Sequence, residues 1–237
     1  MKRVVAYDPC PKCRANGKDS RGDNLVVYSD GGYHCFSCGN HRSPQRFVPK
    51  EEVPNVSKAL LPADFTREVP ANAWKWLLQW GLPYQYWLKK VGFSPKENRL
   101  IFLVGEPTVF SLGRYLGEDK GPKKWYVWGD PHRHCEVVGD GEKIVLVEDL
   151  LSAHKVGQVT TAIPLFGVNY HPPHLYYLMN DARPVVLWLD KDQEGEVKKK
   201  AVKLSMLLNK AVDVLITDKD PKEYSVDEIS RYVSEPS

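Results

Sequence analysis

The carboxyl-terminal part of the chain alternates short apolar runs with longer amphipathic ones. The runs typical of strands span 144–148, 159–167, 184–190 and 211–217, and those typical of helices span 149–157, 171–180 and 193–210. Strands and helices that alternate at these lengths indicate βαβ units, whose strands pair in parallel. The pattern therefore predicts an α/β fold, with a four-stranded parallel sheet in residues 142–237.

Acidic residues follow two of these expected strands. Glu148 ends the first strand, Asp190 ends the third, and Asp192 lies two positions further on. Because the carboxyl ends of parallel strands meet at one edge of a sheet, we expect the three side chains to converge there. Carboxylates that gather repel one another unless a cation is bound, and oxygen ligands favour Mg²⁺ or Mn²⁺. For Asp192 alone, a role as N-cap of helix 193–210 is an equal alternative.

Four cysteines in two CxxC pairs open the chain. They are Cys10, Cys13, Cys35 and Cys38. Two such pairs supply four thiolates to one tetrahedral Zn²⁺, and the intervening Asp30-Gly31-Gly32 favours a hairpin. The alternative is a redox pair or unrelated thiols. We predict a zinc ribbon over 1–42 that needs its metal to fold, and we expect Cys135 to be a buried bystander.

A proline-rich segment separates the ribbon from the rest of the chain. Residues 43–62 contain four prolines and little periodicity, which is typical of a semi-extended linker. Residues 63–141 form a further subdomain, with expected helices at 71–79 and 84–90 and expected strands at 98–104 and 109–112. Its tryptophans at 74, 76, 80 and 87 are expected to be core residues more than base-stacking platforms.

Charge is distributed unevenly along the chain. Residues 1–50 hold nine Lys and Arg against four Asp and Glu, whereas residues 142–237 hold twelve against fifteen. A basic amino-terminal module suits a polyanion, and ordinary solvated surface charge is the alternative. We find no apolar run long enough to span a membrane and no signal peptide, so the expected location is cytoplasmic.

Several motifs together resemble a known family. VLVEDLLSAHKVG and VVLWLDKDQEG carry the E and DxD of a Toprim domain, which primases, topoisomerases, some nucleases and RecR proteins share. DKDPKEY resembles the K-D-P-x-E of primases, and SLGRYLGEDKGPKKWY resembles their basic segment. Over nearly all 237 residues, the order of ribbon, linker and core is similar to DNA primases of the bacterial and phage type. The ribbon is closest to that of phage primase-helicases.

This resemblance implies a function and a set of site residues. A primase makes short RNA primers from NTPs on single-stranded DNA, with Glu148, Asp190 and Asp192 as its catalytic residues. Asp190 and Asp192 would bind the metal ion, and Glu148 would be either a further ligand or a general base. Asp220 would be a further Mg²⁺ ligand or, equally, a loop cap. Residues implied to bind nucleotide or nucleic acid are Arg99, Arg114, Lys123, Lys124 and Gly167 in the core, and Arg14, Tyr33 and His34 in the ribbon. Tyr33 has the alternative of simply packing the ribbon, as do Tyr28 and Phe36. For Lys123 and Lys124, ordinary surface charge is the alternative.

The chain departs from the family pattern at two positions. Asp149 stands where a glycine usually follows the glutamate, and Glu196 stands where a basic residue often follows the glycine of the DxD segment. GxxxxGK[ST] is absent, so we expect a separate replicative helicase and polymerase as partners. A phage origin would place the protein in the host bacterial cytoplasm. The rival interpretations are a RecR-like, non-catalytic DNA-binding mediator and a Toprim nuclease.

Overall fold

The computed structural model describes residues 4–29, 32–42, 60–118, 121–190 and 194–234. The chain divides into two compact units, residues 1–56 and 57–237, and each is described by itself. The expected linker 43–62 lies almost wholly outside the described residues.

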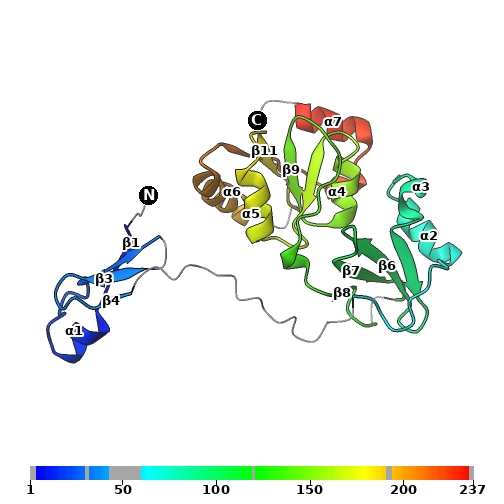
Figure 1. Ribbon diagram of the computed structural model, residues 1–237. Coiled ribbons are helices and arrows are strands. Elements are labelled where there is room, and N and C mark those ends of the chain that lie inside the picture. Colours follow the sequence, from blue (N-terminus) through cyan, green and yellow to red (C-terminus); the bar gives the residue numbers. More distant parts are fainter. Residues whose placement is uncertain (1–3, 30–31, 43–59, 119–120, 191–193, 235–237) are drawn as a thin grey trace. The chain divides into compact units, whose positions relative to one another are not determined.

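The first unit is a small antiparallel sheet with one short helix (Figure 1). Its elements are β1 (Val4–Asp8), α1 (Pro11–Ala15), β2 (Leu25–Tyr28), β3 (Tyr33–Cys35) and β4 (His41–Arg42), and the strands pair in chain order. The expected hairpin is confirmed, because β2 and β3 pair antiparallel with Val27 opposite Tyr33. Asp30 and Gly31 lie outside the described residues. Register places Leu25 opposite Cys35, which brings the second cysteine pair back toward the first.

The second unit begins with helices packed on an antiparallel sheet. Its elements are α2 (Ala71–Leu78), α3 (Tyr84–Trp87), β5 (Val91–Ser94), β6 (Arg99–Val104), β7 (Phe110–Tyr115), β8 (Trp125–Trp128) and the 3-10 turn η1 (Pro131–Arg133). The four strands form a meander in chain order. Trp87 is buried in the core, whereas Trp74, Trp76 and Trp80 pack partly buried against it. The expected helix 84–90 is shorter than predicted, because the chain enters β5 at Val91.

The rest of the second unit is the expected α/β structure. Its elements are β9 (Ile144–Val147), α4 (Leu150–Val156), β10 (Thr161–Pro164), α5 (Pro172–Met179), β11 (Val185–Leu187), α6 (Glu194–Leu208), β12 (Val212–Val214), the 3-10 turn η3 (Pro221–Glu223) and α7 (Val226–Ser234). The four strands are parallel, in the order β10-β9-β11-β12. The prediction of a four-stranded parallel sheet is confirmed.

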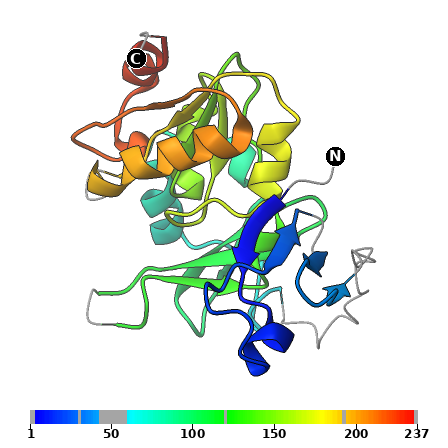
Figure 2. The ribbon, with the colours of Figure 1, turned by 90° about the vertical axis from the view of Figure 1, so that its left-hand side faces the viewer.

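Both faces of the parallel sheet are covered. Along β9, Ile144 and Leu146 pack with α5 and α6, whereas Val145 and Val147 pack with α4 and α7. Figure 1 shows these helix pairs on opposite sides of the sheet, and Figure 2 shows α6 lying across the nearer face. Burial on both faces explains why the strands are continuous apolar runs without alternation.

The strand order creates a switch point between β9 and β11. The chain leaves β9 through α4 toward β10 and returns through α5 to β11, on the other side of β9. Since parallel crossovers keep one hand, this reversal puts α4 and α5 on opposite faces. Ligands of such sheets bind at the carboxyl ends of the strands beside the reversal.

Candidate active site and metal centre

Glu148 and Asp190 lie at this switch point. Glu148 directly follows β9, and Asp190 follows the buried Trp188 and Leu189 at the end of β11. The backbone N–H of Asp190 donates to Oε1 of Glu148 at 3.3 Å. The structure therefore brings these two predicted residues together. The third, Asp192, lies outside the described residues.

The two carboxylates line a cavity of about 750 Å³, which we call the switch-point cavity. It lies between the antiparallel and parallel sheets of the second unit. Its lining includes the predicted site residues Glu148, Asp190, Asp220, Gly167, Arg114 and Lys124, together with Asp149, Lys222, Trp76, Trp80, Trp125 and Phe166. A volume of this size is typical of small-molecule sites.

Asp190 is in an unfavourable electrostatic setting. Burial, followed by the nearby carboxylates of Glu148 and Asp220, raises its pKa to about 7. Its Oδ1 atom is buried and has no hydrogen-bond partner in the described part of the chain. A buried carboxylate oxygen without a donor fits a bound cation, and an all-oxygen donor set fits Mg²⁺ or Mn²⁺.

Lys222 holds two other carboxylates of the cavity. Its Nζ lies 2.9 Å from Oδ2 of Asp149 and 2.6 Å from Oδ2 of Asp220. Burial opposes the lysine charge, but the two carboxylates outweigh it and raise the pKa of Lys222. The sequence motif contained Lys222, yet the prediction assigned it no role. The signal available was a lysine two positions after an expected metal-binding aspartate.

Asp149 is the N-cap of α4. Its Oδ1 accepts from the backbone N–H groups of Leu151 and Ser152, and its Oδ2 accepts from the Ser152 hydroxyl. The carboxylate that departs from the family pattern thus begins a helix and pairs with Lys222. Both of its oxygens are therefore already engaged by the protein.

The basic residues predicted to bind nucleotide have two different placements. Arg114 and Lys124 line the switch-point cavity, and the Arg114 guanidinium lies 5.0 Å from the centre of the Trp76 ring. Arg99 is buried, and it donates to the carbonyls of Gly113 at 3.0 Å and Lys123 at 2.7 Å. Neither Arg99 nor Lys123 is among the described residues that line this cavity. Arg99 therefore holds the backbone of the basic segment in place.

Gly167 has a conformation that favours glycine. Its φ is +142°, and the preceding Phe166 also has a positive φ, of 54°. The Gly167 N–H donates to the Glu148 carbonyl at 3.0 Å, which fixes this loop against the end of β9. A Cβ at this position would meet no atom within 4 Å, so the backbone here faces open space in the cavity wall.

Tryptophans form the apolar wall of the cavity. Trp76 contacts Trp80 and Trp125 edge to face, with ring centroids 6.4 Å and 6.2 Å apart. The ammonium of Lys155 on α4 donates to the Trp80 carbonyl at 2.8 Å and thereby ties this wall to the parallel sheet. These tryptophans combine core packing with a surface facing the cavity, a combination that the sequence prediction treated as alternatives.

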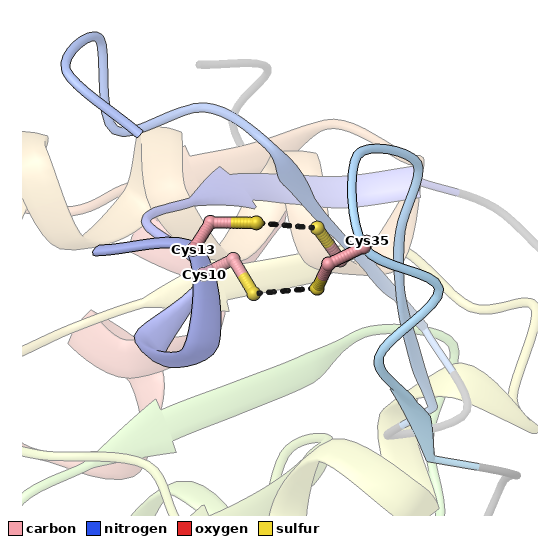
Figure 3. A group of neighbouring side chains, drawn as sticks. Cys10, Cys13 and Cys35 are labelled. Carbon is pink, nitrogen blue, oxygen red and sulfur yellow. Dashed lines mark hydrogen bonds between the residues drawn. The ribbon is translucent and has the colours of Figure 1, made fainter. Parts of the chain in front are cut away.

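The four cysteines of the first unit form a cluster suited to zinc. Their sulfur atoms all lie within 4.8 Å of one another, with 3.6 Å between Cys10 and Cys38 and 3.6 Å between Cys13 and Cys35. Figure 3 shows Cys10 and Cys13 facing Cys35 from the opposite side of the cluster. Tetrahedral ligands at the usual Zn–S length lie roughly 3.8 Å apart. The donor set and its spacing fit zinc, as predicted.

This cluster is distinctive among the described parts of the chain. No other group of three or more His, Cys, Asp or Glu side chains there has its ligand atoms within 4.8 Å of one another. Cys135 belongs to the second unit, where it packs partly buried on the core of the parallel sheet, and burial raises its pKa to about 12. Its expected place as a bystander thiol agrees with these contacts.

The predicted base-contacting residues of the ribbon differ in exposure. Tyr33 packs against the cysteine cluster, and Arg14 is exposed on α1. His34 lies edge to face with Phe36, with ring centroids 4.7 Å apart, and Phe36 is 72% exposed. The prediction treated Phe36 only as packing. Its position inside the second CxxC pair, where a tight turn projects side chains outward, was the available signal.

Comparison with solved structures places this fold. The catalytic domain of DnaG primase, in a structure bound to single-stranded DNA, matches with a TM-score of 0.55 and 14% identity, over 69% of this chain and 71% of that chain. The chain shares the fold of a primase catalytic domain. The primase fragment of the bacteriophage T7 primase-helicase protein matches with a TM-score of 0.49 and 14% identity over 98% of both chains.

Comparison with protein-family models gives no match, and comparison with curated proteins gives none either. The resemblance to primases is confirmed at the level of the fold, by the similarity to the catalytic domain of DnaG primase. Among the described residues, no helix has both the length and the apolar character needed to cross a membrane.

Proposed function

We propose that the protein is a DNA primase that synthesises short RNA primers on single-stranded DNA. The observation that carries this proposal is one cavity with carboxylates at the switch point and Arg114 and Lys124 in its lining. Glu148 and Asp190 are suited to hold a divalent cation, and the two basic residues are suited to hold phosphates. The shared fold of a primase catalytic domain supports the same reaction class.

In this reaction the 3′ hydroxyl of one nucleotide attacks the α-phosphorus of the next. A new P–O bond forms, the bond to the bridging oxygen of the β-phosphate breaks, and pyrophosphate leaves with the electron pair. A divalent cation, when bound, would neutralise phosphate charge. Asp190 and Asp192 would hold this cation, and Glu148 would be either a further ligand or the acceptor of the hydroxyl proton.

The remaining cavity residues position the substrates. Arg114 and Lys124 contact the triphosphate or the template backbone, and the open backbone at Gly167 lets a phosphate approach closely. Arg99 acts indirectly, because it fixes the carbonyl of Lys123 beside Lys124. Lys123 is exposed and serves as a template contact outside the cavity lining.

The zinc ribbon reads the template in this proposal. Single strands are bound by stacking on exposed aromatic rings and by charge, and the ribbon offers Phe36 beside His34, with Arg14 exposed on α1. Zn²⁺, when bound, would hold the four cysteines together and so set the position of these side chains. A separate helicase and polymerase would supply the template and take over the primer.

Primer synthesis by the full-length protein tests the proposal. A single-stranded DNA of mixed sequence, labelled ATP, the other NTPs and Mg²⁺ should give short RNA products on a denaturing gel. Asp190→Asn should abolish them, whereas Asp213→Asn on β12 of the same sheet should leave them unchanged. A chain lacking residues 1–42 should extend a supplied primer but fail to start one.

Other results would favour the rival functions. Shortening of the DNA, with no RNA made on any template, would indicate a Toprim nuclease. Firm DNA binding with neither synthesis nor cleavage would indicate a RecR-like mediator.

A further inference from the structure

Lys222 lies between carboxylates contributed by separate segments of the chain. Its ammonium contacts Asp149, at the start of α4, and Asp220, just before η3, at 2.9 Å and 2.6 Å. The lysine side chain is only 15% exposed. Its Nζ also lies 5.7 Å from the centre of the Trp80 ring, which forms part of the same cavity wall.

Lys222, Asp149 and Asp220 line the switch-point cavity. Glu148 and Asp190 line it too. Glu223 lines the same cavity, so five carboxylates face a single volume, and Lys222 is in contact with two of them. The influence of Lys222 reaches Asp190 as well, since its charge acts to lower the Asp190 pKa while Glu148 and Asp220 raise it. We therefore distinguish the half of the cavity in which Lys222 contacts Asp149 and Asp220 from the half that holds Glu148 and Asp190.

The half with the lysine has little capacity left for a metal ion. Asp149 already accepts from two backbone N–H groups and from a hydroxyl, in addition to Lys222. A divalent cation bridging Asp149 and Asp220 would have to displace an ammonium that is hydrogen-bonded to both carboxylates and shielded from water. In the other half, the buried Oδ1 of Asp190 has no donor in the described part of the chain.

We propose that the ammonium of Lys222 takes the place of a second divalent cation in this cavity. The chain then binds one divalent cation, at Glu148 and Asp190, and Lys222 supplies the other fixed positive charge that faces the incoming phosphates. The role toward phosphates rests on the proposed function, whereas the number of cations bound does not. Lys222 thus positions Asp149 and Asp220 and supplies positive charge to the cavity.

The number of bound Mn²⁺ ions tests this inference. Zinc-loaded full-length protein is titrated with Mn²⁺, and free Mn²⁺ is measured by electron paramagnetic resonance without DNA or nucleotide. The wild-type protein should bind one Mn²⁺ per chain. Lys222→Met should bind two, because Asp149 and Asp220 then repel each other without a counter-ion. Lys219→Met, an exposed lysine in the same loop, should still bind one.

A double substitution shows where the second ion binds. Asp149→Asn combined with Lys222→Met should return the number to one, because asparagine still caps α4 but lacks the charge. If Lys222→Met fails to show the wild-type unfolding curve, Lys222→Gln replaces it, with the same expectation of two ions. Two ions on the wild-type protein, no ion on it, or one ion on the folded Lys222 variant would each overturn the proposal.

The outcome separates this inference from the proposed function. If the wild-type protein binds one Mn²⁺ and Lys222→Met binds two, but the wild-type protein makes no primers, the proposed primase function is refuted and the proposal for Lys222 still holds. If the wild-type protein makes primers but binds two Mn²⁺, the primase function is supported and the proposal for Lys222 is refuted.

Discussion

The backbone N–H of Asp190 donates to the side chain of Glu148 at 3.3 Å, across 42 positions of sequence. This hydrogen bond joins the ends of β9 and β11, and it fixes the relative position of two carboxylates that would otherwise repel. One Glu148 oxygen is used for this purpose. Oδ1 of Asp190 has no such donor among the described residues, so it is the atom on which a cation would have the largest effect.

We predict that Asp190 destabilises the metal-free protein as pH rises. Its pKa is about 7 in the folded chain but about 4 in an unfolded one, so the folded state holds the proton more tightly between these values. The free energy of unfolding contributed by this group therefore falls as pH rises from about 4 to about 7. Because Asp190 is only partly buried and faces the cavity, we discount the effect to about 1 kcal/mol between pH 5 and pH 8.

The measurement compares wild-type protein with Asp190→Asn by urea unfolding at both pH values. All seven tryptophans lie in the second unit, so their fluorescence reports that unit. Burial lowers the pKa of His154 to about 3 and of His174 to about 4, and both act in the opposite sense below pH 6.5. The informative quantity is therefore the free energy of unfolding of Asp190→Asn minus that of the wild-type protein. This difference should increase from pH 5 to pH 8 and vanish with saturating Mg²⁺. A difference that decreases from pH 5 to pH 8 would contradict the prediction.

We predict that zinc holds the first unit together independently of the second. Cys38→Ser should lose the bound zinc and the structure of residues 4–42, since this small sheet has few core residues besides the cysteines. Zinc content by mass spectrometry and circular dichroism would measure this. Cys135→Ser is the matched control and should keep one zinc. Tryptophan fluorescence should show the same unfolding midpoint in both variants, and a shift in Cys38→Ser would argue that the units depend on each other.

We predict that the neighbouring lysines of the basic segment differ in effect. Lys124 lines the switch-point cavity and Lys123 does not, so Lys124→Ala should raise the KM for NTPs roughly tenfold by removing a charge-assisted phosphate contact. Lys123→Ala should leave this KM within about twofold and weaken DNA binding at low salt instead. Steady-state primer synthesis and filter binding would distinguish the two variants. Equal effects on KM would indicate that the triphosphate lies outside the cavity.

We predict that Phe36 is a stacking platform for template bases. Its ring is 72% exposed and braced by His34, so Phe36→Ala should weaken binding to single-stranded DNA by about 1–3 kcal/mol, the usual range for one stacked base. Fluorescence anisotropy with a labelled oligonucleotide measures the loss. Tyr7→Ala removes another exposed ring, on β1, and should have little effect. A comparable loss in both variants would favour diffuse contact over a defined stack.

Secondary structure and the cysteine site suited to zinc followed from local patterns. The four strands of the parallel sheet and the helices between them coincide with the expected segments within a few residues. A sheet buried on both faces has strands that are continuous apolar runs, and such runs can be recognised from neighbouring residues alone. The cysteine cluster was equally predictable, since paired CxxC turns determine which atoms can meet one metal ion. The convergence of Glu148 and Asp190 followed from strand direction alone.

The sequence alone determined which residues end the strands and which thiols gather, because those relations depend on periodicity and short spacing. Only the tertiary structure decided which charges meet inside the cavity. Asp149 and Lys222 are separated by 73 positions, and no local rule pairs them, yet they lie 2.9 Å apart. Arg99 and Arg114 both belong to the predicted basic group. Arg99 donates hydrogen bonds to backbone carbonyls, whereas Arg114 lines the cavity. Long-range packing sets such contacts, since burial obliges each charged group to find a partner wherever the fold supplies one.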